Sequence, residues 1–175
     1  MSTYELRKKF LAIARTNVGK TESSRNNGSW IKPLWTATNY PGGYAERQPY
    51  CCAGMAWALR EWLKLPEVLK AFKFTPAQAE ARRCKSASCF RADYSWESWA
   101  RASDLLLPKN TEVLHAGDLI IYSFSHIEAY VDDLPDRKFM AIGYNTNSAG
   151  SRDGDGCWEK PRSRAQIRSI IRLLP

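Results

Sequence analysis

Two adjacent cysteines, Cys51 and Cys52, open the stretch of the chain with the clearest chemical character. They follow Pro49 and begin a run of good helix formers with no β-branched residue before Val68, which predicts a helix that starts at the thiols. Unpaired N–H groups and the positive end of the dipole at a helix N-terminus favour thiolate over thiol. The pair therefore predicts a nucleophile if a base lies nearby, and otherwise two small apolar fillers of a buried helix.

A histidine, the base that such a thiol needs, begins a predicted strand at residues 126–132. Strand alternation places His126 and Glu128 together on the less apolar face of that strand, whereas His115 lies before the preceding strand. Asn145 follows the next predicted strand, where its amide could orient the imidazole or serve ordinary turn chemistry. Cysteine on a helix, histidine on a strand and a polar orienting group on a later strand form the papain-like arrangement of parts.

The elements that must position these groups change character along the chain. Helical periodicity dominates the first hundred residues, and strand patterns dominate the rest, which predicts an α+β fold with N-terminal helices packed on a C-terminal antiparallel sheet. The length suits one domain, residues 1–175. The predicted helices cover 3–18, 51–63, 66–72, 76–83 and 95–100, and the predicted strands cover 118–123, 126–132, 138–144 and 167–173, with 157–159 a weaker candidate.

A long polar stretch, residues 20–48, separates the first two helices and carries several aromatic rings, Trp30, Trp35, Tyr40 and Tyr44. Rings in such a loop either line a cleft or pin the loop to the body by burying large area without regular structure. The sequence leaves both interpretations open.

Charge and hydropathy limit the partners. The chain has 26 basic and 18 acidic residues, a net charge of +8, which predicts attraction to polyanions such as nucleic acid, anionic lipid or bacterial wall polymers. No apolar run reaches membrane-spanning length, and the N-terminus lacks the order of a secretory signal.

Five cysteines, an odd number, argue against a fully paired disulfide framework. Cys84 and Cys89 are close enough in sequence for a local bridge, although helical geometry there would hold them apart. The spacings do not give two close pairs of zinc ligands, so no metal and no cofactor is expected.

Several short blocks, in order, give the chain a family resemblance. Together they are similar to the CHAP (cysteine, histidine-dependent amidohydrolase/peptidase) and NlpC-type peptidoglycan hydrolases, over nearly the whole chain. The blocks are Val18–Glu22 with Asn26-Asn27, Tyr50-Cys51-Cys52-Ala53 with Trp57, Ala116–Ile121, His126–Val131 and Ile142–Thr146.

The resemblance implies a papain-like fold with Cys51, His126 and Asn145 as catalytic residues, and it selects Cys51 over Cys52, which helical phase does not. The family's frequent glutamate falls on Gly143, so Asn145 would orient His126 unaided. The substrate-binding residues implied are Gln48 and Tyr50, as helpers of an oxyanion, with Trp30, Tyr44 and Glu128 shaping the cleft.

The implied activity is hydrolysis of amide bonds in the peptide part of bacterial peptidoglycan, the expected partner, by a monomer with no nucleic-acid partner and no membrane span. A protein made in the cytoplasm without a signal peptide, and acting in the periplasm or cell wall, suits a phage lysin released by a holin. It equally suits an effector delivered by a secretion system, which would have an immunity protein. The alternatives are a basic module that binds glycan or nucleic acid without catalysis, and a cysteine deamidase or transglutaminase acting on proteins.

Overall fold

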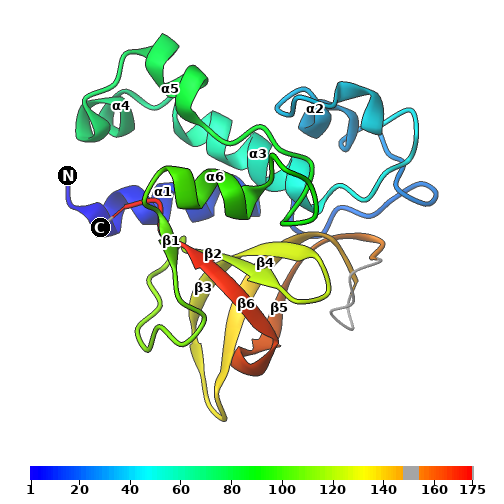
Figure 1. The fold of residues 1–175 in the computed structure, drawn as a ribbon. Helices are drawn as coiled ribbons and strands as arrows, with labels where there is room; N and C mark the ends of the chain where they lie inside the picture. Colours follow the sequence, from blue (N-terminus) through cyan, green and yellow to red (C-terminus); the bar gives the residue numbers. More distant parts are fainter. Residues whose placement is uncertain (148–153, 175) are drawn as a thin grey trace.

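The computed structural model describes residues 1–147 and 154–174 and places the helices in a layer above a strongly twisted sheet (Figure 1). Every neighbouring pair of strands in this sheet runs antiparallel. Six helices come before the first long strand in the described chain, so the predicted α+β class is confirmed.

Local signals start the helices. Ser2, Thr75 and Ser95 each cap a helix through a side-chain oxygen, and a proline opens two of the others. The helices are α1 (Thr3–Arg15), α2 (Lys32–Trp35), α3 (Cys51–Trp62), α4 (Pro66–Phe72), α5 (Pro76–Arg82) and α6 (Trp96–Ala102), with 3-10 turns η1 (Pro41–Gly43) and η2 (Arg164–Gln166).

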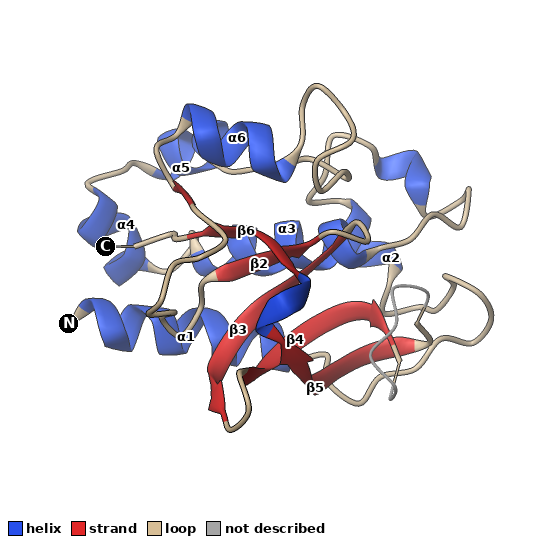
Figure 2. Cartoon of the chain, turned by 60° about the horizontal axis from the view of Figure 1, so that its bottom comes forward, coloured by secondary structure: helices blue, strands red, loops and turns tan. Residues whose placement is uncertain are grey.

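Within the described residues the sheet has six strands in the spatial order β1-β6-β2-β3-β4-β5 (Figure 2). Strands β2 to β5 form a meander, and β6 returns to lie on the other side of β2. The strands are β1 (Leu106–Leu107), β2 (Leu119–Tyr122), β3 (His126–Leu134), β4 (Lys138–Thr146), β5 (Gly156–Ser163) and β6 (Ile167–Ile171).

Helix α3 packs closely on the sheet because it carries Gly54. A Cβ at this position would overlap the ring of Tyr144 on β4. The hydroxyl of Tyr144 also donates to the Ala14 carbonyl of α1 (3.0 Å) and accepts from Asn17 (3.3 Å). One tyrosine therefore fixes both helices against the strand, and with them the start of α3.

The first five residues of β3 are buried on both faces of the strand, in the alternation that the sequence predicts. Ile127 and Ala129 belong to the large core between helices and sheet, whereas Tyr130 packs in a second apolar cluster on the opposite face. His126 and Glu128 share the face of Tyr130 by alternation and are fully buried. The second face is therefore shielded from solvent here, and the two polar side chains on it need hydrogen-bond partners within the protein.

The first helix ends at Arg15, so the prediction that it extends to Val18 was wrong. Thr16 caps α1, and the chain then turns so that Gly19 and Lys20 exchange backbone hydrogen bonds with Cys157 (2.9 and 3.0 Å). Gly19 has φ +88°, a conformation that glycine adopts without strain. Pairing with the start of β5 outweighs continuation of the helix.

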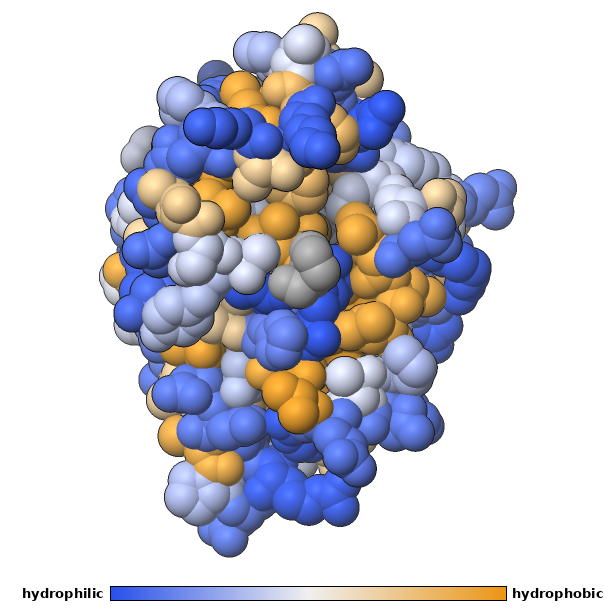
Figure 3. All heavy atoms as spheres, turned by 90° about the vertical axis from the view of Figure 1, so that its left-hand side faces the viewer, coloured by the Kyte–Doolittle hydropathy of each residue, from blue (hydrophilic) through white to orange (hydrophobic). Residues whose placement is uncertain are grey.

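The face that carries both chain ends exposes apolar side chains among hydrophilic ones (Figure 3). A mainly apolar cavity of about 470 Å³ is lined by residues of α3 to α6 together with Leu105 and Leu173. None of the residues predicted to do chemistry lines it. In the described residues no helix combines the length and the apolar character needed to cross a membrane.

Candidate active site

Cys51 is the first residue of α3, where the sequence predicts the helix to begin. Its side chain reaches an open cleft of about 210 Å³ beside α3. The residues that line this cleft are Trp35, Tyr40, Gln48, Pro49, Cys51, Cys52, Ala87, Ser88, Cys89 and Ser125. A thiol at a helix N-terminus that also meets a cleft has both the electrostatics and the access that a nucleophile needs.

His126 is the first residue of β3 and follows Ser125, whose φ of 64° turns the chain into the strand. Its imidazole is fully buried and stacks with the rings of Tyr122 and Phe124, with centroids 6.1 and 6.0 Å away. Nε2 lies 3.0 Å from Oε1 of Glu128. Nδ1 has no hydrogen-bond partner among the described residues, so it is the ring nitrogen left to exchange a proton with Cys51.

Glu128 is held by a set of donors beneath His126. Nε of Arg162 donates to its Oε2 at 2.7 Å, the hydroxyl of Tyr122 donates to the same oxygen at 2.8 Å, and Nη2 of Arg162 pairs with Oε1. Gly143 faces Glu128 across the β3–β4 ladder, and a Cβ at Gly143 would overlap the carboxylate. Because Gly143 has no side chain, it leaves the space in which the Glu128 carboxylate lies.

The three groups shift one another's pKa values. Hydrogen bonds from Cys52 and Cys89, together with His126, outweigh burial and hold the pKa of Cys51 well below its usual value. Burial would lower the pKa of His126, but Cys51 and Glu128 outweigh it and raise that pKa to about 9. Burial likewise opposes ionisation of Glu128, yet Arg162 and His126 lower its pKa to about 2.

These shifts favour a thiolate and an imidazolium side by side at neutral pH, with a carboxylate behind the imidazolium. A thiolate is the reactive form of cysteine, and an imidazolium next to it can deliver a proton to a leaving group. The arrangement can therefore carry out nucleophilic acyl transfer.

The predicted orienting residue, Asn145, lies two residues beyond Gly143, which pairs with Glu128, and therefore at the same end of the β3–β4 ladder as His126. It is buried, has φ 53° and sits where the register between β4 and β5 shifts, a conformation that asparagine tolerates better than most residues. Among the described residues the partner of the imidazole Nε2 is Glu128 and not Asn145. The structure thus adds Glu128 as a group that contacts the ring, and an orienting role for Asn145 stays a prediction.

Two further cysteines lie beside the nucleophile. The sulfurs of Cys51, Cys52 and Cys89 are all within 4.8 Å of one another, and those of Cys52 and Cys89 are 3.3 Å apart. All five cysteines are buried and free, and Cys89 faces Cys52 rather than Cys84. The local bridge considered for Cys84 and Cys89 is absent from the structure.

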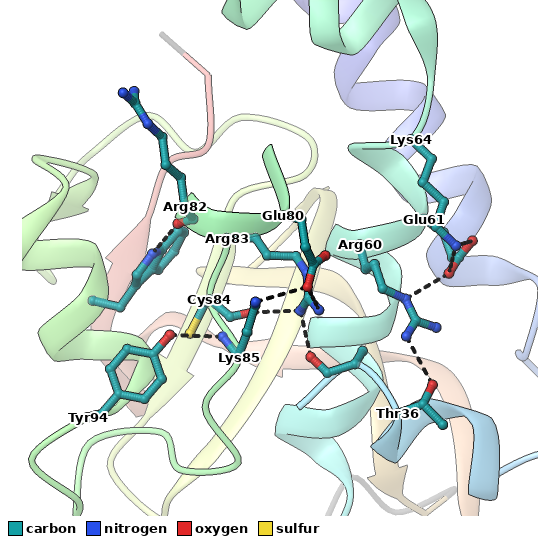
Figure 4. Close-up of polar contacts among 12 residues, drawn as sticks. Thr36, Arg60, Glu61, Lys64, Glu80, Arg82, Arg83, Cys84, Lys85 and Tyr94 are labelled. Atoms are coloured by element: carbon teal, nitrogen blue, oxygen red, sulfur yellow. Dashed lines mark hydrogen bonds and ion pairs between the residues drawn. The ribbon is translucent and has the colours of Figure 1, made fainter. Parts of the chain in front are cut away.

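Cys89 reaches this position on the segment between α5 and α6, which is anchored at both ends. Arg83 pairs with Glu80 and donates to the backbone carbonyl of Ala37, and the hydroxyl of Tyr94 accepts from the Lys85 amide at 3.0 Å (Figure 4). At the other end the carbonyl of Cys89 accepts from an amide in the first turn of α6 at 3.0 Å. The thiol is therefore held by a fixed loop.

The predicted substrate-binding residues divide into two groups. Gln48 is exposed and lines the cleft. Tyr50, predicted to help an oxyanion, and Glu128, predicted to shape the cleft, are 0% exposed and do not line the cleft: Tyr50 packs against Trp30, and Glu128 contacts His126.

In the loop of residues 20–48, two of the aromatic rings pin the loop to the body of the protein and two line the cleft. Trp30 donates to the Thr21 carbonyl at 2.8 Å and Tyr44 donates to Asn27 at 2.7 Å, so these two rings pin the loop and do not line the cleft. Trp35 and Tyr40 do line it.

Sequence reasoning missed Arg162, Cys89 and the orienting contact of Glu128. Arg162 lies on β5 only two strands from β3, but the weak strand signal at 157–159 gave no reason to align it with Glu128. Cys89 comes from a loop 37 residues after Cys52, and no local spacing indicates that contact. The signal for Glu128 was present: it shares a strand face with His126, and a glycine stands where the family has its carboxylate.

Compared with family models, with curated proteins and with solved structures, the chain gives no match.

Proposed function

We propose that this protein is a papain-like cysteine hydrolase that cleaves amide bonds in the peptide part of bacterial peptidoglycan. The observation that carries the proposal is the buried His126 imidazole, which contacts the Glu128 carboxylate at 3.0 Å and influences the pKa of the Cys51 thiol beside a cleft. A helix with cysteine at its N-terminus, packed on an antiparallel sheet with histidine at a strand start, supports the papain-like assignment.

In the proposed reaction the Cys51 thiolate attacks the amide carbonyl, and the His126 imidazolium gives its proton to the departing amine. This leaves a thioester on Cys51 and a neutral imidazole. The imidazole then takes a proton from water, whose oxygen attacks the thioester, and the acid product leaves with the thiolate and imidazolium restored. Glu128 stabilises the imidazolium in both halves and acts as a positioning residue.

The negative oxygen that forms in each half needs donors near the nucleophile. The backbone N–H of Cys51 lies in the first turn of α3, where amides have no partner within the helix. Gln48 lines the same cleft, and its side-chain amide can supply a second donor. Tyr50 is buried and is not part of this proposal.

The substrate class rests on the family resemblance and on charge. A net charge of +8 favours accumulation on an anionic wall polymer, and aromatic side chains of Trp35 and Tyr40 give the cleft apolar walls. The same proposal covers a phage lysin and an effector delivered to a rival cell, and in the second case an immunity protein that covers the Cys51 cleft is the expected partner.

Purified sacculi provide the direct test. The protein is incubated with sacculi, and the soluble muropeptides are separated and identified by mass, with the Cys51→Ala variant as the control. We expect new peptide-containing fragments with wild type and none with the variant. Release of ammonia from a glutamine-containing protein, without release of muropeptides, would instead favour a deamidase. The absence of both ammonia and muropeptides would contradict the proposed hydrolysis.

A further inference from the structure

Three buried sulfurs converge at the base of the cleft. Cys51 and Cys52 come from the start of α3 and Cys89 from the fixed loop before α6, and their sulfurs all lie within 4.8 Å of one another. Zinc bound by thiolates has Zn–S bonds of about 2.3 Å, which at tetrahedral angles sets the sulfurs about 3.8 Å apart. The sulfurs of Cys52 and Cys89 are 3.3 Å apart, and no two of the three sulfurs are more than 4.8 Å apart, so the observed distances lie on both sides of that value.

The imidazole of His126 is not one of the ligand atoms that lie within 4.8 Å of one another, but it interacts with one of the three thiols. The Nδ1 atom of His126 is buried and has no hydrogen-bond partner among the described residues, and the thiol of Cys51 acts on the same ring. The other ring nitrogen already contacts the Glu128 carboxylate at 3.0 Å. Histidines that bind metal ions commonly engage a carboxylate through their second nitrogen, which fixes the tautomer and the ring orientation.

Access and charge also suit a cation. All three cysteines line the cleft of about 210 Å³, so an ion can reach the sulfurs from solvent without opening the core. Three thiolates around Zn²⁺ carry one net negative charge, which the N-terminus of α3 favours. The ion would replace the protons of the thiols and of the imidazolium, as thiolate sites generally require.

We propose that Cys51, Cys52 and Cys89 bind a Zn²⁺ ion, that a rotation of the His126 ring brings Nδ1 to the ion as the fourth ligand, and that the bound ion keeps the enzyme inactive until it is removed. The three-sulfur site stands on the geometry alone. The inhibitory role rests on the proposed function, because it requires Cys51 and His126 to be the reacting pair. A reversible block of this kind keeps the Cys51 thiolate from reacting for as long as the ion is bound.

Cobalt provides a spectroscopic test that does not depend on hydrolysis. Under anaerobic, reducing conditions, Co²⁺ titrated into wild type should give intense visible ligand-field bands of a tetrahedral thiolate site at one equivalent, bleached by Zn²⁺. Loss of an outer-shell partner already costs about 10- to 100-fold in affinity, so Cys89→Ser should weaken binding by at least about 100-fold. Cys84→Ser is the matched control, because Cys84 is buried near the start of the same loop but lies outside the sulfur cluster.

The proposed site is wrong if wild type gives only the pale spectrum of octahedral Co²⁺, or if Cys89→Ser binds as well as Cys84→Ser does. A second readout covers the case in which Cys89→Ser fails to fold, as judged by circular dichroism. Zn²⁺ should protect Cys51 of wild type from iodoacetamide, mapped by peptide mass spectrometry, and unprotected labelling would also overturn the site.

Activity then tests the inhibitory role separately. Zn²⁺ should lower hydrolysis of sacculi by wild type and by Cys84→Ser to the same extent, each measured against its own zinc-free rate, and chelation should restore both. A tetrahedral cobalt spectrum without any hydrolysis would leave the metal site standing and remove the proposed function. Hydrolysis that Zn²⁺ does not inhibit would remove the inhibitory role.

Discussion

Two carboxylates, Asp118 just before β2 and Glu128 on the neighbouring strand β3, are fully buried and have different surroundings. Asp118 precedes β2 and pairs with Arg172 (2.7 Å) and Arg7 (3.4 Å), with a backbone amide at 2.9 Å. Glu128 is also held by an arginine, but one of its oxygens lies against the titratable ring of His126.

The difference separates a structural ion cluster from a chemical one. Both carboxylates satisfy the rule that a buried charge needs paired, hydrogen-bonded partners. Around Asp118 the ion-pair partners are arginines, which stay charged at every accessible pH, so no proton is exchanged within these pairs. Around Glu128 one partner is an imidazole that also faces a thiol, so the carboxylate controls a proton that can move.

Among substitutions in the group formed by Cys51, His126 and Glu128, removal of the Cys51 thiol should lower the rate of hydrolysis the most. We expect Cys51→Ala to reduce hydrolysis of sacculi by at least about 10⁴-fold while circular dichroism stays unchanged, because residues of a catalytic unit fail together. Cys52→Ala, its matched control, should lose far less. Iodoacetamide should label Cys51 first and faster than free cysteine, since its pKa is depressed. Activity retained in Cys51→Ala would end the assignment.

Replacement of the Glu128 carboxylate should have the next largest effect on the turnover rate. We expect Glu128→Gln to lower the turnover rate by about 10²-fold, and Asn145→Ala by less than about 10-fold, because Glu128 contacts the ring. The rates of both variants on one muropeptide decide the order. The reverse order would restore Asn145 as the orienting residue.

The pH profile sharpens the same test. The reactive pair needs His126 protonated, and its pKa is raised to about 9, so the rate of wild type should fall as the pH rises through about 9. Glu128 favours the imidazolium, so Glu128→Gln should move this alkaline limb to lower pH. A loss of rate with an unmoved limb would mean that the carboxylate serves only the fold.

Asp118→Asn should separate stability from catalysis. Breaking a buried pair leaves an uncompensated charge, so we expect the free energy of unfolding to fall by about 3 kcal/mol, measured with urea. The turnover rate below the unfolding transition and the position of the alkaline limb should stay the same. A shifted limb would show that the two clusters are coupled and that the comparison is too simple.

The smallest effect concerns net charge. The excess of lysine and arginine should concentrate the enzyme on anionic wall polymer, so added salt should slow turnover on sacculi by a few-fold more than on a small neutral stem peptide. Equal salt responses on the two substrates would remove this role.

Much of the fold follows from local patterns. The starts of α3, α4, α5 and α6 and the positions of β2, β3, β4 and β6 lie at or close to where periodicity, proline and capping signals place them. The alternation along β3 is likewise the predicted one. Local chemistry carries this information because caps and faces depend on neighbours within a few residues.

The parts of the site that escaped prediction depend on contacts between distant segments. Arg162 reaches Glu128 only because β5 pairs with β4 in one particular register, and Cys89 reaches Cys52 only because a loop is anchored at both ends. The burial of Tyr50 has the same origin, since Trp30 from a distant turn covers it. No local signal fixes such distances.

The space beside Gly143 on β4 is filled by the Glu128 side chain on β3, so a side chain at one position excludes a side chain at the other. This limits the order in which substitutions at the two positions are tolerated. Adding a glutamate at Gly143 first would drive two side chains and two negative charges into space for one. Removing Glu128 first would leave His126 and Arg162 without their carboxylate. We therefore expect each single change to impair the protein and the two positions to show strong epistasis, so the reciprocal exchange Gly143→Glu with Glu128→Gly should recover more activity than either change alone.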